Sequence, residues 1–178
     1  MKTKLLPLLL LAAALVAQSA SAADPKSSEF EALKKQVQQH LATFDDLDFN
    51  VFSNQKWDEL YRSHSKDVIV HWPDGHIAVG IDKHIADLKY LFTYAPDTRI
   101  KEHPVKVGQG EWTAVYGIME GTFTKPMTTA DGTVIPPNGK SFKLPMATIS
   151  HWNKEGSMDE EYLFWDNATY MTQLGLGK

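Results

Sequence analysis

Side chains suited to proton transfer are concentrated near the end of the chain, where an aromatic-rich strand pattern runs into a short helical pattern. Asp166 lies at this junction. Because successive strand residues point to opposite faces, Tyr162, Phe164 and Asp166 are expected to share one face. A carboxylate beside two aromatic rings is partly desolvated, which raises its pKa towards the range of a general base. The pattern therefore predicts Asp166 as a catalytic acid/base.

Asp166 also fits a second role, as the N-cap of the helix that follows. Asp directly before Asn167-Ala168-Thr169 is a favourable capping residue, because its carboxylate accepts hydrogen bonds from free backbone N–H groups. A cap turns the carboxylate onto the N–H of Ala168 or Thr169, whereas an acid/base catalyst points into an enclosed cavity. The residues alone leave both roles open.

His71 is the candidate partner of Asp166. It lies in the segment Val68–Trp72, which is predicted to be a strand, and its imidazole can hydrogen-bond a substrate carbonyl or pair with Asp166. The alternative is a structural histidine without a chemical role. Large aromatic side chains are candidates for contacting a substrate, or for ordinary core packing. These candidates are Trp72, Tyr116, Trp152, Tyr162 and Phe164.

Strand parity bears on two further polar residues. His151 is adjacent to Trp152 and is expected to face the opposite way, away from the pocket. Glu120 shares its face with Tyr116. It is an interior carboxylate if that face lines the cavity, and a solvent-exposed one otherwise.

Metal and cofactor chemistry are not predicted. The histidines lie on separate predicted elements, without His-x-His or His-x-x-x-His spacing. A site built from His71, His76 and Asp74 is the alternative to a metal-free protein. The sequence contains no phosphate-binding glycine loop and no dinucleotide fingerprint. We therefore expect neither a metal ion nor an organic cofactor.

The first 22 residues have the pattern of a secretory signal peptide. Lys2 and Lys4 precede the apolar run Leu5–Ala17, and Ala20-Ser21-Ala22 fits the small-x-small cleavage pattern. The apolar run is short for a membrane span. We expect cleavage near Ala22 and a periplasmic or secreted product without a membrane attachment.

Charge and cysteine content exclude several classes of function. The chain carries 18 basic and 22 acidic side chains, and removal of Lys2 and Lys4 makes it more acidic. Nucleic acids and anionic membranes need a basic face, so neither is an expected partner. The absence of cysteine excludes disulfides, thiolate metal sites and cysteine nucleophiles.

Hydrophobic periodicity places helices before strands. This order predicts one α+β domain, residues 29–178, preceded by a polar segment, residues 23–28, that is expected to be disordered. A long antiparallel sheet curls, and helices can then fill its concave side around a conical cavity. The predicted helices are 29–44, 57–61, 81–94 and 168–174, and the predicted strands are 68–72, 77–79, 99–109, 111–125, 141–153 and 158–165.

Three segments together resemble the SnoaL-like polyketide cyclase, or ester cyclase, family of the nuclear-transport-factor-2-like superfamily. They are Gly121-Thr122-Phe123, Pro136–Phe142 and Ile149–Leu176, and the resemblance runs from Trp57 to Leu176. It implies an α+β cone, in which a curved antiparallel sheet wraps around N-terminal helices, with an apolar pocket at the wide end. In these cyclases an aspartate is the general acid/base for an intramolecular aldol ring closure. That aspartate falls on Asp166.

The chain departs from the family pattern at three places. The histidine of the family's Gly-Thr-His is Phe123, and the family's Glu-x-Trp is Glu160-Glu161-Tyr162, which keeps an aromatic. The polar partners on the preceding strand fall near Ser150 and Trp152, so one polar group has become an aromatic. The resemblance thus adds Ser150 to the substrate-binding candidates. One hypothesis is a cofactor-free lyase, isomerase or cyclase in which Asp166 acts on a small apolar or cyclic carbonyl compound. The alternative is a non-catalytic small-molecule-binding or interaction module of the same fold, which Phe123 and Trp152 favour. In either case the expected ligand is small and apolar or aromatic, and such a domain can form a homodimer through the outer face of its sheet.

Overall fold

The computed structural model describes residues 25–177, and the structural statements below concern these residues. The predicted signal peptide, residues 1–22, lies outside this range. Of the segment expected to be disordered, residues 23–24 also lie outside, whereas residues 25–28 form the first turn of helix α1. No helix within 25–177 is both long and apolar enough to cross a bilayer.

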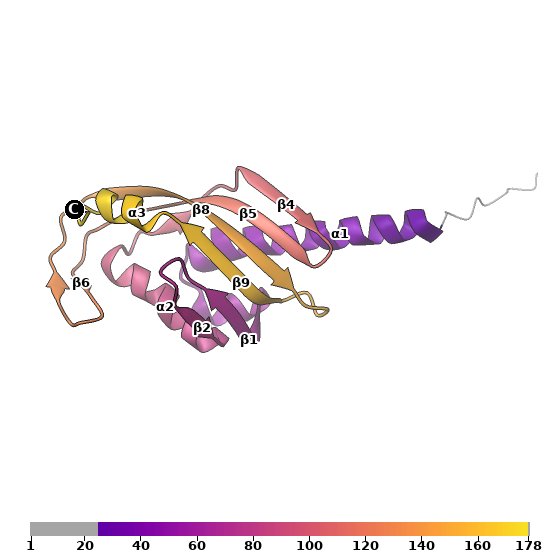
Figure 1. Cartoon of the computed structure of the whole chain (residues 1–178), viewed down its shortest axis with the longest axis horizontal. Coiled ribbons are helices and arrows are strands. Elements are labelled where there is room, and N and C mark those ends of the chain that lie inside the picture. Colours follow the sequence, from indigo (N-terminus) through magenta and orange to yellow (C-terminus); the bar gives the residue numbers. More distant parts are fainter. Residues whose placement is uncertain (1–24, 178) are drawn as a thin grey trace, which may run out of the picture.

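Helical elements come first in the chain (Figure 1). Helix α1, Pro25–Asp46, runs into a π-helical segment, Leu47–Phe52, which a 3-10 segment follows at Trp57–Arg62. The first half of α1 projects beyond the rest of the molecule, and its side chains there are exposed. Helix α2, Ile81–Tyr94, follows β2 in the sequence, and the short helix α3, Asn167–Gln173, follows the last strand.

Seven strands form one curved sheet, in the order β2-β1-β9-β8-β5-β3, with β4 also paired to β5. All pairs are antiparallel except β1 with β9, which is parallel. A separate two-stranded hairpin consists of β6, Met127–Thr128, and β7, Val134–Ile135. The sheet strands are β1 His64–His71, β2 Ile77–Val79, β3 Arg99–Ile100, β4 Val105–Gln109, β5 Trp112–Thr122, β8 Ser141–Trp152 and β9 Met158–Trp165.

The strand predicted over residues 99–109 is interrupted between β3 and β4. Pro104 has no N–H to donate to a sheet ladder. His103 is drawn towards the end of α1, where its Nδ1 lies 2.7 Å from Asp45 Oδ1 and its Nε2 lies 2.8 Å from Asp48 Oδ2. These two contacts attach the interrupted strand to the helix.

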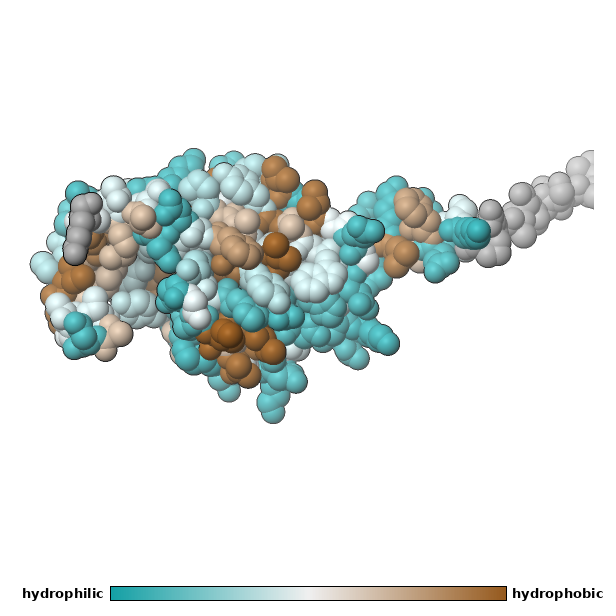
Figure 2. Space-filling model, viewed as in Figure 1, coloured by the Kyte–Doolittle hydropathy of each residue, from teal (hydrophilic) through white to brown (hydrophobic). Residues whose placement is uncertain are grey.

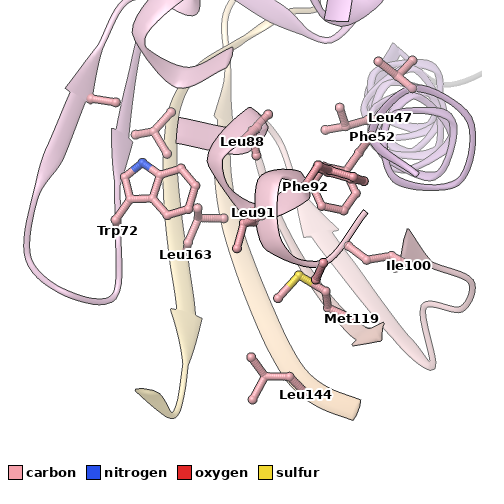
Figure 3. Packing of buried hydrophobic residues seen from close by; sticks show 14 of the residues in the cluster. Leu47, Phe52, Trp72, Leu88, Leu91, Phe92, Ile100, Met119, Leu144 and Leu163 are labelled. Carbon is pink, nitrogen blue, oxygen red and sulfur yellow. The ribbon is translucent and has the colours of Figure 1, made fainter. Parts of the chain in front are cut away.

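The core lies between the concave face of the sheet and the helices. Leu88, Leu91 and Phe92 of α2 point into it (Figure 3). The strands alternate as a half-buried sheet should: in β8, Phe142 and Leu144 are buried whereas Lys143 is exposed. Alternation in β9 buries Glu161 and Leu163, so one carboxylate belongs to the concave, buried face.

Candidate functional site

Asp166 is the N-cap of α3. Its Oδ1 accepts hydrogen bonds from the N–H of Ala168 at 2.8 Å and of Thr169 at 3.1 Å, and its Oδ2 accepts one from the Thr169 hydroxyl at 2.9 Å. The Thr169 N–H and hydroxyl, with the Ala168 N–H, hold the pKa of Asp166 below its usual range. The expectation of a desolvated carboxylate with a raised pKa is therefore wrong, because the side chain is exposed.

The face shared by Tyr162 and Phe164 is the convex, outer face of the sheet. Tyr116, Ala147 and Phe164 stand opposite one another on β5, β8 and β9, and Phe164 is 50% exposed. Tyr162 is half-buried on the same face. Tyr116, Tyr162 and Phe164 thus lie on the side of the sheet away from the helices. In β9 the side chain of Glu161 faces the buried side, so that of Glu160 and those of Tyr162 and Phe164 face outward.

His71 also lies on the outer face, away from Asp166. Its ring stacks on Tyr162 with centroids 4.2 Å apart, and its Nε2 lies 3.0 Å from Glu160 Oε1. Glu160 also accepts a hydrogen bond from the Tyr162 hydroxyl at 2.7 Å. The structure therefore brings His71 together with Tyr162 and Glu160, and the pairing of His71 with Asp166 is not formed.

The predicted residues that do face inward are Trp72, Ser150 and Trp152. Trp152 is fully buried, and its indole N–H donates to Thr113 Oγ1 at 2.9 Å. Its ring stacks on His40 at 4.6 Å, so Trp152 is a core residue. The Ser150 hydroxyl is buried without a hydrogen-bond partner among residues 25–177.

Strand parity is confirmed for His151, which faces away from Trp152. Its Nδ1 lies 2.6 Å from Asp159 Oδ1, and this contact raises its pKa. Glu120 takes the solvent-exposed alternative, since it pairs with Arg99 and Lys101 on the outer face. Neither residue contributes to an interior site.

A pocket of about 370 Å³, which we call the aromatic pocket, is lined by residues of α2, α3, the β6–β7 hairpin and the turn after β1. Trp72 forms one wall, and the hydroxyls of Tyr94 and Tyr170 lie 2.8 Å apart in another. Burial raises the pKa of Tyr170 to about 12, so this phenol remains a hydrogen-bond donor. The lining residues are Trp72, Asp74, His76, Asp87, Tyr90, Leu91, Tyr94, Met127, Thr129, Ala130, Trp165, Asn167, Tyr170, Met171 and Leu174.

His76 is the imidazole of the aromatic pocket. Its Nδ1 lies 2.6 Å from Asp74 Oδ1, its Nε2 lies 3.3 Å from Asp87 Oδ2, and its ring stacks on Trp72 at 5.3 Å. Desolvation acts to raise the pKa of Asp74, but the hydrogen bonds from His76 outweigh it and lower that pKa. The pocket therefore combines apolar walls with one imidazole and two neighbouring carboxylates, those of Asp74 and Asp87.

A second polar group, which we call the buried triad, lies inside the cone and consists of His64, His84 and Glu161. Glu161 Oε2 lies 3.7 Å from His64 Nε2 and 3.6 Å from His84 Nε2, and no side chain of the three is more than 4% exposed. Burial lowers the pKa of His84 to about 4. Desolvation acts to raise the pKa of Glu161, but His64 and His84 outweigh it, so the carboxylate stays ionised.

The buried triad is the one set of three potential metal ligands in the described part of the chain. The alternative set of His71, His76 and Asp74 does not assemble, because His71 lies on the outer face with Glu160. Sequence reasoning missed the triad. The sequence did contain a signal for it. Glu161 lies on the same strand face as Leu163, and His84 lies one helical turn before Leu88, so both polar residues share a face with an apolar one.

Comparison with known proteins gives a consistent result. A family model described as SnoaL-like polyketide cyclase matches residues 49–174. No match was found among curated proteins. Among solved structures, a SnoaL-like protein from Jannaschia sp. CCS1 is 19% identical with a TM-score of 0.67, and covers 79% of this chain and 94% of its own.

Two further solved structures have the same fold. IdmH from Streptomyces antibioticus is 20% identical with a TM-score of 0.64, over 77% of this chain and 99% of its own. A protein from Xanthomonas campestris pv. campestris is 15% identical with a TM-score of 0.67, over 78% and 98%. At such identities the likeness establishes the fold, and it confirms the predicted α+β cone.

Proposed function

Because the chain belongs to the SnoaL-like polyketide cyclase family, we propose that it binds a small apolar or ring-shaped carbonyl compound in the aromatic pocket and moves protons on it. Membership supports a cyclase- or isomerase-type role in general. One observation carries the specific proposal: His76, held between Asp74 and Asp87, is the imidazole at the wall of an aromatic pocket. Pockets that combine apolar walls with a few fixed polar groups are typical ligand sites.

The His76–Asp87 pair can supply both halves of an enolisation. The Asp87 carboxylate accepts the proton from the carbon next to the substrate carbonyl. The His76 Nε2–H then turns from Asp87 to the carbonyl oxygen and stabilises the enolate that forms. The 3.3 Å separation of Nε2 and Asp87 Oδ2 is long for a charge-assisted hydrogen bond, so this contact is readily exchanged for one to a ligand.

Asp166 has a positioning role in this proposal. By capping α3, its carboxylate fixes the helix that carries Tyr170 and Leu174 into the pocket wall. Asp166 itself is exposed and is not among the residues that line the pocket. The family resemblance implied an acid/base role for Asp166. In this proposal His76 and Asp87, which line the pocket, have that role instead.

Proton exchange at carbon is the sharpest test of the catalytic step. Ligands that co-purify with the protein are identified by mass spectrometry, and deuterium exchange at their α-carbon is followed by proton NMR. We expect His76→Gln to bind within a few-fold of the parent but to lose exchange by about 100-fold or more. The matched control is His151→Gln, a histidine on the outer face that also pairs with carboxylates. Equal exchange rates in His76→Gln and the parent would exclude His76 as the acid.

A non-catalytic binding module is the second candidate. The observation that favours it is the commitment of the Asp166 carboxylate to a helix cap. In this case the parent protein binds its co-purified ligand without accelerating deuterium exchange, and both histidine variants bind alike. The same experiment therefore separates the two functions.

We also propose export, since residues 1–22 match a signal peptide. The intact mass of the protein recovered from the periplasm of a bacterial host tests it. Loss of residues 1–22 supports export, and a full-length product in the cytoplasm contradicts it.

A homodimer through the outer face of the sheet is the proposed assembly. Exposed apolar side chains on that face include Tyr116, Ile149 and Phe164, and brown patches lie over β1, β2 and β4 in Figure 2. Light scattering measures the mass in solution, and Phe164→Glu is expected to yield monomers if this face is the interface.

A further inference from the structure

The buried triad has the composition and geometry of a cation site. His64 is the first residue of β1, Glu161 lies on the neighbouring strand β9, and His84 lies in the first turn of α2 above them. The three side chains come from three elements and converge inside the cone. Their ligand atoms all lie within 4.8 Å of one another.

The contacts around His64 orient its ring. The Ser63 hydroxyl lies 3.1 Å from the Leu60 carbonyl oxygen, and Ser63 Oγ lies 2.9 Å from His64 Nδ1. Nδ1 is thus engaged with Ser63, and Nε2 is the ring nitrogen that faces Glu161.

Two buried polar atoms thus face each other without a hydrogen bond. His64 Nε2 and Glu161 Oε2 have no hydrogen-bond partner among the described residues. At 3.7 Å they are too far apart to hydrogen-bond each other. Buried polar atoms that lack a partner are rare in proteins, and such a pair indicates an occupant.

We propose that His64, His84 and Glu161 bind one divalent transition-metal ion. Two imidazoles and one carboxylate are the ligand set of catalytic Zn²⁺ sites and of non-haem Fe²⁺ sites. Ligands about 2.1 Å from a tetrahedral ion lie about 3.4 Å apart. The two Glu161–histidine separations, 3.6 Å and 3.7 Å, are close to this value, and the three ligand atoms all lie within 4.8 Å of one another.

The surroundings of the triad agree with this assignment. Ser63 contacts His64 at Nδ1, the ring nitrogen that does not face the triad, and metal-bound histidines are commonly oriented by such a contact at their other nitrogen. The ring of Trp72 lies 5.9 Å from that of His84 and also lines the aromatic pocket, so the ion would lie just behind the pocket wall.

This inference does not depend on the proposed function, and it departs from the expectation of a metal-free protein. The test uses the full chain expressed without a histidine tag and purified without chelators. We expect about one equivalent of Zn²⁺ or Fe²⁺ by elemental analysis. The chelated protein should unfold at a lower temperature and regain its stability with Zn²⁺, because the ion binds only the folded state.

Cobalt and two variants make the test specific. Co²⁺ added to the chelated protein should give visible absorption bands of a four- or five-coordinate nitrogen- and oxygen-ligated ion. Glu161→Gln should abolish stoichiometric binding, and Ser63→Ala should weaken it by about 10- to 100-fold. The matched control, Glu160→Gln, changes the neighbouring carboxylate on the outer face and should bind like the parent.

Two results would overturn the proposal. One is a folded parent protein that retains only traces of metal and shows neither cobalt bands nor stabilisation by Zn²⁺. Glu161 would then share a proton with a neighbouring histidine instead of binding a metal ion. The other is full Co²⁺ binding by a folded Glu161→Gln protein, which would locate the ion elsewhere. Circular dichroism of each variant separates loss of the ion from loss of the fold.

Discussion

The two faces of the sheet differ in what their polar residues do. On the outer face, Glu160 receives hydrogen bonds from His71 and Tyr162. One residue further along β9, Glu161 faces inward to two buried histidines without a hydrogen bond to either. A shift of one position along a strand thus separates a satisfied surface pair from an interior group that needs an occupant.

The largest contrast between the faces is expected in packing. Trp152→Ala removes a fully buried ring and its hydrogen bond to Thr113, and should lower the free energy of unfolding by about 3–5 kcal/mol. Phe164→Ala removes an outer aromatic that is 50% exposed, and should cost less than about 1 kcal/mol in a monomer. Urea denaturation of both variants measures the difference. Similar losses in the two would contradict the assignment of faces.

The faces should also respond to acid with opposite sign. Burial lowers the pKa of His84 to about 4, so between about pH 6.5 and 4 the unfolded chain binds a proton that the folded chain does not. Stability is full above about pH 6.5, and about 3 kcal/mol is lost as the pH falls to about 4. The raised pKa of His151, caused by Asp159, acts in the other direction. Its small contribution is present below the unfolded pKa and is lost as the pH rises through the folded pKa.

Urea midpoints of the chelated, metal-free protein, measured from pH 4 to 8, test this pair. His84→Gln should remove much of the loss on acidification, whereas His151→Gln should make that loss slightly steeper. If both variants follow the parent, neither histidine controls the acid response.

The smallest expected effect belongs to Asp166. Asp166→Ala should lower the thermal midpoint by a few degrees through loss of the cap, whereas Asp166→Asn should leave it nearly unchanged because Asn caps equally well. Ligand turnover should survive in Asp166→Asn. Loss of turnover with retained binding in that variant would instead identify Asp166 as the acid/base. An exposed residue would then have a catalytic role.

Local patterns were sufficient to predict most of the fold. Alternation along Ser141–Trp152 and helical spacing over Ile81–Tyr94 each follow from burial of one face, and the structure has both elements. The helix cap at Asp166 could also be predicted from the sequence, because it involves only the next three residues.

The site was harder to predict because its geometry is not local. Parity along β9 was assigned from the aromatics Tyr162 and Phe164, yet the side chain that the fold buries is Glu161. A buried carboxylate contradicts the usual preference, so the hydrophobic pattern alone pointed to the wrong face. The partners of Glu161, His64 and His84, become neighbours only after β1 and α2 have packed on β9.

The parallel pairing of β1 with β9 has a consequence for when the chain can fold. His71 and Glu160, which this pairing brings together, are 89 residues apart in the sequence. The sheet cannot be completed until the last strand has left the ribosome, and such long-range contacts form slowly. A nascent chain that stays unfolded until its last strand emerges agrees with the proposed export, in which the chain crosses the membrane before it folds.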